Sequence, residues 1–299
     1  MTSRHLLHFF ALLTFLTTAS TAQESTFELR PKWQPDQFYL LETDTDTLTS
    51  LTALGQKHDQ KLHMRQTTSV KVRQTTSGEL EARVTLDSLK GEMIHDGILL
   101  PFDADAIQDA HPILQKTIGR ATGKAFTLAY DAQGRFLDAR DMGTLIKGGQ
   151  TPDLNSIADA KQVALLFRRS LEMALPNIPV RPDDKWISDE SISFPEAGRV
   201  QVRLNAKFTE LTQREGHRTA KITFEGALET QTDQNTRHTV KVGKDSKVSG
   251  EVHFDLDRQT VSHSTILSVL QLEVEGKKLP VRQQVTTRLV AMKRLTTGG

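Results

Sequence analysis

Two histidines near the C-terminal end of the chain have a spacing that could serve metal binding or a response to pH. His253 and His263 flank a predicted hairpin turn centred near Arg258, so a three-residue loop would place them directly opposite each other on neighbouring strands. Facing imidazoles can share a metal ion or titrate near neutral pH. His253 alternates with the apolar residues Val252 and Phe254, which places it on the solvent side of the strand. We therefore expect a solvated cross-strand pair, with a surface metal site or a pH-sensitive role as the alternative.

Two other groups of possible metal ligands are less specific. His58-Asp59 and His63 are close in sequence, but residues five apart on a strand face opposite sides and do not share an ion. Asp44 and Asp46 resemble the start of a paired-carboxylate motif, yet they lie in a Thr-rich stretch with no glycine turn and no later ligand. Solvated strand or loop residues explain both groups, and we predict no metal ligand.

Motifs for catalysis and cofactor binding are absent from the sequence. It contains no Gly-Lys-Ser/Thr phosphate loop, no His-Glu-x-x-His and no Gly-x-Ser-x-Gly nucleophile turn. We predict no catalytic residue and no cofactor. A hydrolase with a site at the seam of two structural units stays open as an alternative, and it would need a buried carboxylate pair or a serine–histidine contact.

Polar residues within a predicted strand give the one hint of a ligand. Alternation over residues 62–70 places Gln66 and Thr68 in an inward row with apolar neighbours. The same pattern over residues 200–208 places Leu204 and Phe208 inward. Inward amide and hydroxyl groups need partners, so they mark a polar spot inside an apolar concavity. We predict a mainly hydrophobic ligand with its polar head near Gln66 and Thr68, and binding that depends on Leu204 and Phe208.

The strands that would position these residues come from an internal duplication. The segment GELEARVTLDSL at 78–89 matches GHRTAKITFEGA at 216–227 in its order of basic, apolar, threonine and acidic residues. Two further pairs match in the same sequence order, and each is a strand next to a turn that contains aspartate: 34–42 with 181–189, and 126–134 with 250–258. Each copy therefore reads as an antiparallel meander.

One amphipathic helix connects the two copies. A stripe of apolar residues recurs at intervals of three and four: Ile157, Ala160, Ala164, Phe167, Leu171 and Ala174. Asp153 to Ser156 offer caps, Pro176 and Pro179 end the pattern, and a weaker helix is predicted at 112–118. We predict a mainly β fold with one to two helices (α+β): a first unit at 26–150, a helical connector at 151–179 and a second unit at 180–295. The two antiparallel units form two small sheets or, as we favour, one curved sheet or half-barrel covered by the helix.

The first 22 residues have the features of a signal peptide. A basic Arg4, an apolar core from Leu6 to Leu16 and the small residues before Gln23 predict export and cleavage after Ala22, to the periplasm or the medium of a bacterium. The chain has no cysteine, so neither disulfides nor a lipid-modified cysteine is expected. Cleavage removes one basic residue, which leaves 37 basic and 37 acidic residues from the 38 and 37 of the whole chain. A neutral, evenly mixed surface does not favour nucleic-acid binding, and we expect no membrane span in the mature chain.

Several segments resemble a known family. The aromatic residue after a Pro-Asp turn, the segment 123–128 leading into 131–135, and the segment 175–186 are similar to a family of uncharacterised secreted bacterial proteins rich in β-structure, many with lipoprotein leaders. The resemblance covers nearly the whole mature chain and implies an exported β-rich protein. It carries no activity or site residue, and the absence of a lipid-attachment cysteine here argues against membrane tethering.

Three functions are consistent with these features. The first is an exported, non-catalytic binding or envelope-associated protein, with a hydrophobic small molecule or an envelope component as partner. The second is a periplasmic carrier of a lipid or another hydrophobic ligand, which needs a continuous apolar cavity between sheet and helix. The third is the hydrolase with a site at the seam of the two units.

Overall fold

The computed structural model describes residues 25–53, 56–112, 114–115, 122–141, 160–194, 198–231, 240–274 and 276–295. The predicted signal peptide, the caps before the connector helix and most of the predicted helix at 112–118 lie outside these residues. The described elements are β1 (Gln37–Ala53), β2 (Gln56–Gln74), β3 (Leu80–His95), β4 (Ile98–Asp103), η1 (Ala104–Asp109), β5 (Ala125–Tyr130), β6 (Phe136–Arg140), α3 (Ala160–Glu172), β7 (Lys185–Phe194), β8 (Gly198–Arg214), β9 (His217–Gln231), β10 (Val240–Val242), β11 (Lys247–Asp255), β12 (Thr260–Val274) and β13 (Lys277–Arg294).

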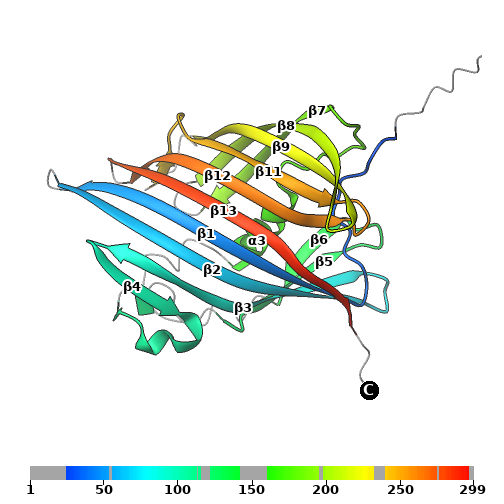
Figure 1. Cartoon of the computed structure of the whole chain (residues 1–299), viewed down its shortest axis with the longest axis horizontal. Helices are drawn as coiled ribbons and strands as arrows, with labels where there is room; N and C mark the ends of the chain where they lie inside the picture. The colour runs from blue at the N-terminus through cyan, green and yellow to red at the C-terminus, as the bar shows by residue number, and fades with distance from the viewer. Residues whose placement is uncertain are drawn as a thin grey trace, which may run out of the picture.

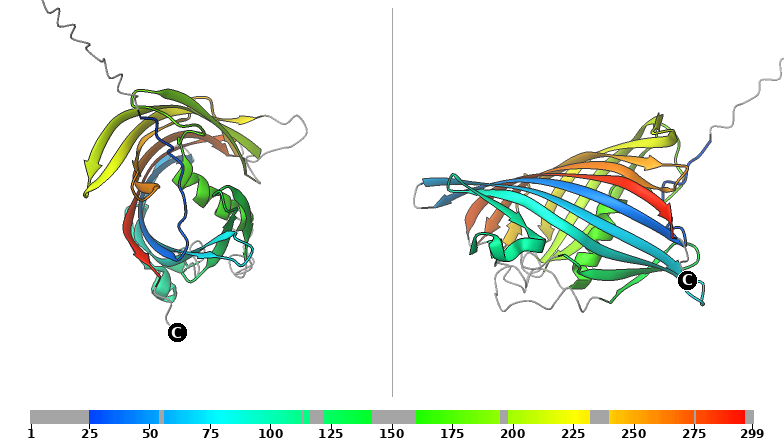
Figure 2. Two further views of the ribbon diagram at one scale, coloured as in Figure 1. Left: turned by 90° about the vertical axis from the view of Figure 1, so that its right-hand side faces the viewer. Right: turned by 60° about the horizontal axis from the view of Figure 1, so that its bottom comes forward.

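All 13 strands belong to one antiparallel sheet, which confirms the predicted fold class. Its main path runs β6-β5-β3-β2-β1-β13-β12-β11-β9-β8-β7, with β4 on β3 and β10 on β12. The sheet is strongly curved, and α3 lies inside the curve (Figures 1 and 2). The joined form is therefore the correct one of the two predicted arrangements, and β1 and β13 make the junction.

The two meanders share details of geometry as well as strand order. Each starts at a Pro-Asp turn: Asp36 and Asp183 both have positive φ, of 56° and 70°. Their backbone N–H groups donate to the carbonyls of Val72 and Phe208, each in the second strand of its own unit. Aspartate is favoured at such positions because it tolerates the left-handed region of backbone conformation. A two-residue hairpin joins β8 to β9, with Arg214 paired to His217.

Apolar side chains cover the inner face of the sheet in two large clusters. The first core cluster comprises Leu29, Ala174, Leu175, Val180, Val200, Val202, Leu204, Ala206, Phe208, Ala220, Ile222, Phe224, Val248, Val252, Phe254, Leu256, Val261 and Ile266. The second core cluster comprises Tyr39, Leu41, Val70, Val72, Leu80, Ala82, Val84, Phe126, Leu128, Tyr130, Ala139 and Ala164. Phe167 and Leu171 of α3 pack on the second cluster, so this helix buries its apolar stripe as predicted.

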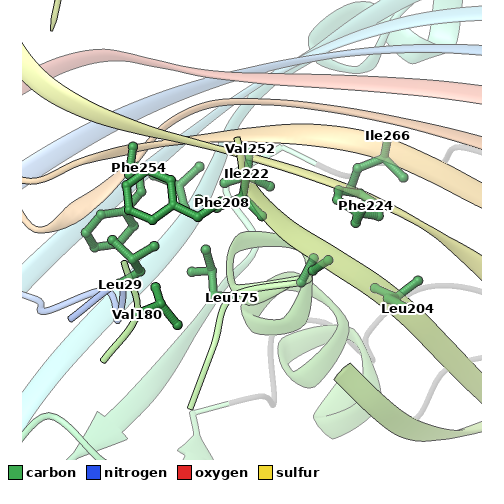
Figure 3. Packing of buried hydrophobic residues seen from close by; sticks show 14 of the residues in the cluster. Leu29, Leu175, Val180, Leu204, Phe208, Ile222, Phe224, Val252, Phe254 and Ile266 are labelled. Carbon is green, nitrogen blue, oxygen red and sulfur yellow. The ribbon is translucent and has the colours of Figure 1, made fainter. Parts of the chain in front are cut away.

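Residues 25–36, here called the N-terminal segment, pass across one end of the curved sheet (Figure 2). Phe27 exchanges two backbone hydrogen bonds with Val180, of 2.7 and 3.0 Å. Leu29 is 1% exposed and faces Leu175 and Val180 (Figure 3). Trp33 stacks edge-on against Tyr39, with 5.0 Å between ring centroids. The segment thus closes one end of the interior, and its irregular sequence gives no period from which this could be predicted.

Candidate ligand-binding surface

A polar band crosses the inner face between the two apolar clusters. Residues paired across strands lie on the same face, and the register joins Gln66 to Thr43, Thr43 to Thr287, and Thr287 to Ser264. Tyr39, Leu41 and Thr43 are every second residue of β1, so their side chains lie on the same face. Because Tyr39 and Leu41 belong to the second core cluster, this row is on the inner face. The polar band, defined by these rows, consists of Thr43, Thr45, Thr47, Gln66, Thr68, Ser264, Ser268, Gln283 and Thr287.

The groups of the polar band are partly paired with one another. Thr43 Oγ1 and Thr287 Oγ1 are 3.1 Å apart across the junction of the two units. The Gln283 amide donates to Thr47 Oγ1 at 3.2 Å, and the Gln66 amide donates to Thr68 Oγ1 at 3.1 Å. Thr43, Thr47, Gln66, Gln283 and Thr287 remain partly exposed, so their other donors and acceptors can reach a ligand.

The structure brings two of the predicted ligand residues together and separates them from the other two. Gln66 and Thr68 lie on the inner face, as predicted, and Thr68 is 3% exposed. Leu204 and Phe208 also point inward, but they are 2% and 0% exposed within the first core cluster. Phe208 packs edge-on against Phe27 at 5.9 Å, under the N-terminal segment. Contact of all four residues with one ligand remains a prediction.

The polar spot predicted at Gln66 and Thr68 is part of a larger polar surface. Seven other band residues come from β1, β12 and β13, whose pairing across the junction has no local sequence signal. The only local sign of these additional polar residues in the sequence is the threonine at every second position from 43 to 47. The nine residues that define the band carry hydroxyls and amides, with neither a carboxylate nor an imidazole among them.

The outer face carries the charges of the same strands. Glu42 pairs with Arg288 at 2.6 Å, Asp44 with Arg65 at 2.7 Å, and Asp46 with the ring of His63 at 2.8 Å. These pairs place Asp44, Asp46 and His63 on an ion-paired strand surface, in agreement with the prediction.

His253 and His263 are direct cross-strand partners, as predicted, with ring centroids 5.6 Å apart. The expectation of a solvated pair is wrong for His253, which is only 9% exposed, whereas His263 is partly exposed. The strand register shifts directly after His253, and the Glu251 carboxylate lies 3.2 Å from the His253 ring. Both features bring neighbouring groups close to this ring. Burial, followed by the nearby Arg214 and His253, lowers the pKa of the His263 imidazole, which favours the neutral ring.

One cluster of possible metal ligands was not found from the sequence. His217, Asp255 and Asp257 place ligand atoms within 4.8 Å of one another. Asp255 accepts hydrogen bonds from the backbone N–H groups of Asp257 and Arg258, at 3.0 and 2.8 Å. Backbone and side-chain bonds from Arg218 lower the pKa of the Asp257 carboxyl. The Asp255 carboxylate thus caps the β11–β12 turn, as Asp131 does by accepting from Gln133 and Arg135 in the first unit, while the Asp257 carboxylate ties this turn to Arg218 of β9.

The described residues contain no helix that is both long and apolar enough to cross a membrane.

Comparison with known proteins gives a fold likeness and no family. No protein-family model matches the chain, and no curated protein matches it. A solved structure entitled "Lipid-protein interactions in lipovitellin" is similar over 90% of this chain at 10% identity and a TM-score of 0.52, and the match spans 26% of that longer chain. The COG4313 outer membrane channel of Pseudomonas putida F1 aligns with 87% of this chain and 97% of its own at 9% identity, with a TM-score of 0.28. The first likeness shows that this kind of curved antiparallel sheet occurs in a known structure.

Proposed function

We propose that this chain is a non-catalytic binding protein of the bacterial cell envelope, and that it holds a mainly hydrophobic ligand with a neutral polar head on the inner face of its sheet. The observation that carries the proposal is the polar band, which lies between apolar clusters and presents partly exposed hydroxyl and amide groups. Small-molecule sites usually combine apolar walls with a limited number of polar groups that orient the ligand.

The chemistry of the band defines the kind of head group. Hydroxyls and carboxamides both donate and accept, and none carries a charge, so they match a ligand with hydroxyl or ester groups. Beside the band, Leu62, Met64 and Val285 are partly exposed inner residues that would contact the apolar part of the ligand. The likeness to the lipovitellin structure, whose title concerns lipid–protein interactions, supports a lipid as the ligand class. Location in the envelope rests on the predicted signal peptide.

The test uses purified exported protein and displacement of an apolar fluorescent dye by monooleoylglycerol, a neutral lipid with free hydroxyls. Saturable displacement at micromolar lipid is expected. The double variant Thr43→Val/Thr287→Val removes both members of an inner hydroxyl pair with little change of shape, so stability should be nearly unchanged while affinity for the lipid falls about tenfold.

The matched control is Thr265→Val/Thr286→Val, since these threonines form a cross-strand pair on the outer face of β12 and β13. This control should bind as the unmodified protein does. Equal loss in both double variants, or no saturable binding by the unmodified protein, would reject the inner-face site.

A further inference from the structure

A separate pocket of about 410 Å³ lies where the two edges of the sheet approach each other. β6 and β7 end the strand order on opposite sides, yet Phe136 of β6 and Ile187 of β7 line the same pocket. The end of α3 and the N-terminal segment supply the remaining walls. The seam pocket, as we call it, is lined by Leu29, Arg30, Pro31, Gly134, Arg135, Phe136, Arg168, Glu172, Leu175, Pro176, Asn177, Ile187, Ser188 and Asp189.

The seam pocket has an excess of positive charge. Three arginines and two acidic residues line it, which leaves a formal charge of 3 − 2 = +1. Arg135 pairs with Asp131 at 2.6 Å, outside the lining, and Asp189 approaches Arg203 at 3.9 Å. Arg30 is partly buried, and no ion-pair partner lies within 4.0 Å of it among the described residues. An unpaired guanidinium in a partly enclosed site favours an anion with two oxygen acceptors.

Arg168 is held in position on the floor of the same pocket. Its guanidinium carbon lies 4.4 Å above the centre of the Phe136 ring, and its Nε is 3.3 Å from a Glu172 carboxylate oxygen. The side chain is 23% exposed and lines the pocket, so part of it can contact a ligand there. A stacked and ion-paired arginine loses little freedom on binding, which makes it a suitable second contact for an anion.

The other walls are apolar. Leu29, Phe136, Leu175 and Pro176 surround the charged end, and Ile187 is 54% exposed at the rim. A site with apolar walls and a large exposed aliphatic side chain is expected to bind a ligand that has a hydrocarbon part. Free phosphate or carboxylate would leave these walls uncovered.

The geometry points to the seam pocket as a binding site for an anionic amphiphile, a single alkyl chain with a carboxylate or phosphate head bound by Arg30 and Arg168. This site is independent of the polar band, which lies on the inner face between the two core clusters and takes a neutral head. Its walls come from both sheet edges, α3 and the N-terminal segment. A bound ligand would therefore join two edges that no strand pairing connects within the described part of the chain.

Isothermal titration of the exported protein with four probes tests the assignment: decanoate, decyl phosphate, decanol and inorganic phosphate. Decanoate and decyl phosphate should bind saturably, each at least about tenfold more tightly than decanol, because loss of one charge-assisted contact costs about that factor. Arg30→Gln should reduce binding of both anionic probes about tenfold and leave monooleoylglycerol displacement unchanged. Arg168→Lys, which retains the charge, should weaken them less than Arg30→Gln does.

Arg83→Gln is the matched control, since Arg83 is exposed on β3 and lies outside the pocket lining. The thermal unfolding midpoint of each variant is compared with that of the unmodified protein to check that the variant is folded. Equal affinity for decanoate and decanol, or unchanged decanoate binding in Arg30→Gln, would overturn the site. Inorganic phosphate binding as tightly as decyl phosphate would overturn the amphiphile as its ligand. Failure of the neutral lipid to bind the inner face leaves these outcomes unaffected, because they involve different residues.

Discussion

Leu29→Ala tests whether the N-terminal segment is part of the folded core. Leu29 is 1% exposed and packs among residues of the first core cluster, including Leu175 and Val180. Truncation removes three carbons, about 2.4 kcal/mol at about 0.8 kcal/mol for each buried group, and the cavity left behind raises the cost to about 3–4 kcal/mol. For a chain of this size, that loss lowers the thermal midpoint by about 5–7 °C.

The assay is urea denaturation followed by tryptophan fluorescence, which reports on this region because Trp33 lies in the same segment. Glu28→Ala is the control: Glu28 neighbours Leu29 but is exposed and makes only a surface ion pair with Lys32 at 2.7 Å. It should cost less than about 0.5 kcal/mol. Equal unfolding midpoints for the two variants would show that the segment is a loose tail, and the closed end of the interior would have to be abandoned.

Three further predictions address other parts of the fold. Gly226→Ala should cost about 1–3 kcal/mol in urea denaturation, because an added Cβ would lie 1.9 Å from the Arg203 carbonyl oxygen; a cost no greater than that of Glu225→Ala would contradict this. Trp186→Phe should cost about 1 kcal/mol, because the indole N–H donates to the Ala174 carbonyl at 3.0 Å just after α3, and an unchanged midpoint would refute that role. The Asp257 carboxyl has a pKa lowered from its usual 3.8, so its stabilisation is present above about pH 4 and lost as pH falls through the folded pKa. Asp257→Asn should therefore be less stable than the unmodified protein at pH 6, with the difference shrinking toward pH 2 in denaturation series, and a constant difference would contradict the linkage.

The sequence predicts the local parts of this fold well, since alternation has a short period. The inward rows of β2 and β8 and the apolar stripe of α3 all follow from residues close together in the chain. The pairing of β1 with β13 does not, because hydrogen bonds between strands far apart in sequence leave no periodic signal. β4 and η1 were missed for another reason: β4 pairs with β3, and both elements pack through a separate apolar cluster that includes Leu89, Phe102 and Ile107.

The candidate site was less predictable than the strands. Gln66 and Thr68 were placed correctly on the inner face, but the polar band depends on the register across the junction. The seam pocket combines Arg30, Phe136, Arg168 and Ile187, which come from four segments of the chain, and only the curvature of the sheet brings them together. Exposure of His253 was mispredicted because a strand period gives the face of a residue and says nothing of what its neighbours cover.

The junction of β1 with β13 also has a consequence for how the protein folds. Phe38 pairs with Lys293, so the central ladder of the sheet joins nearly the two ends of the chain. Bringing these distant strands together lowers the conformational entropy of the chain before their hydrogen bonds stabilise the pairing. This ladder should therefore form late, after the two meanders. Until then β1 has one unpaired edge, which is open to association with other chains. Since the N–H of Leu295 donates to the carbonyl of Asp36 at 2.7 Å, a short linker between these ends would turn the slowest pairing into a local hairpin. A circular permutant opened between the two units should therefore fold faster than the natural order of the chain.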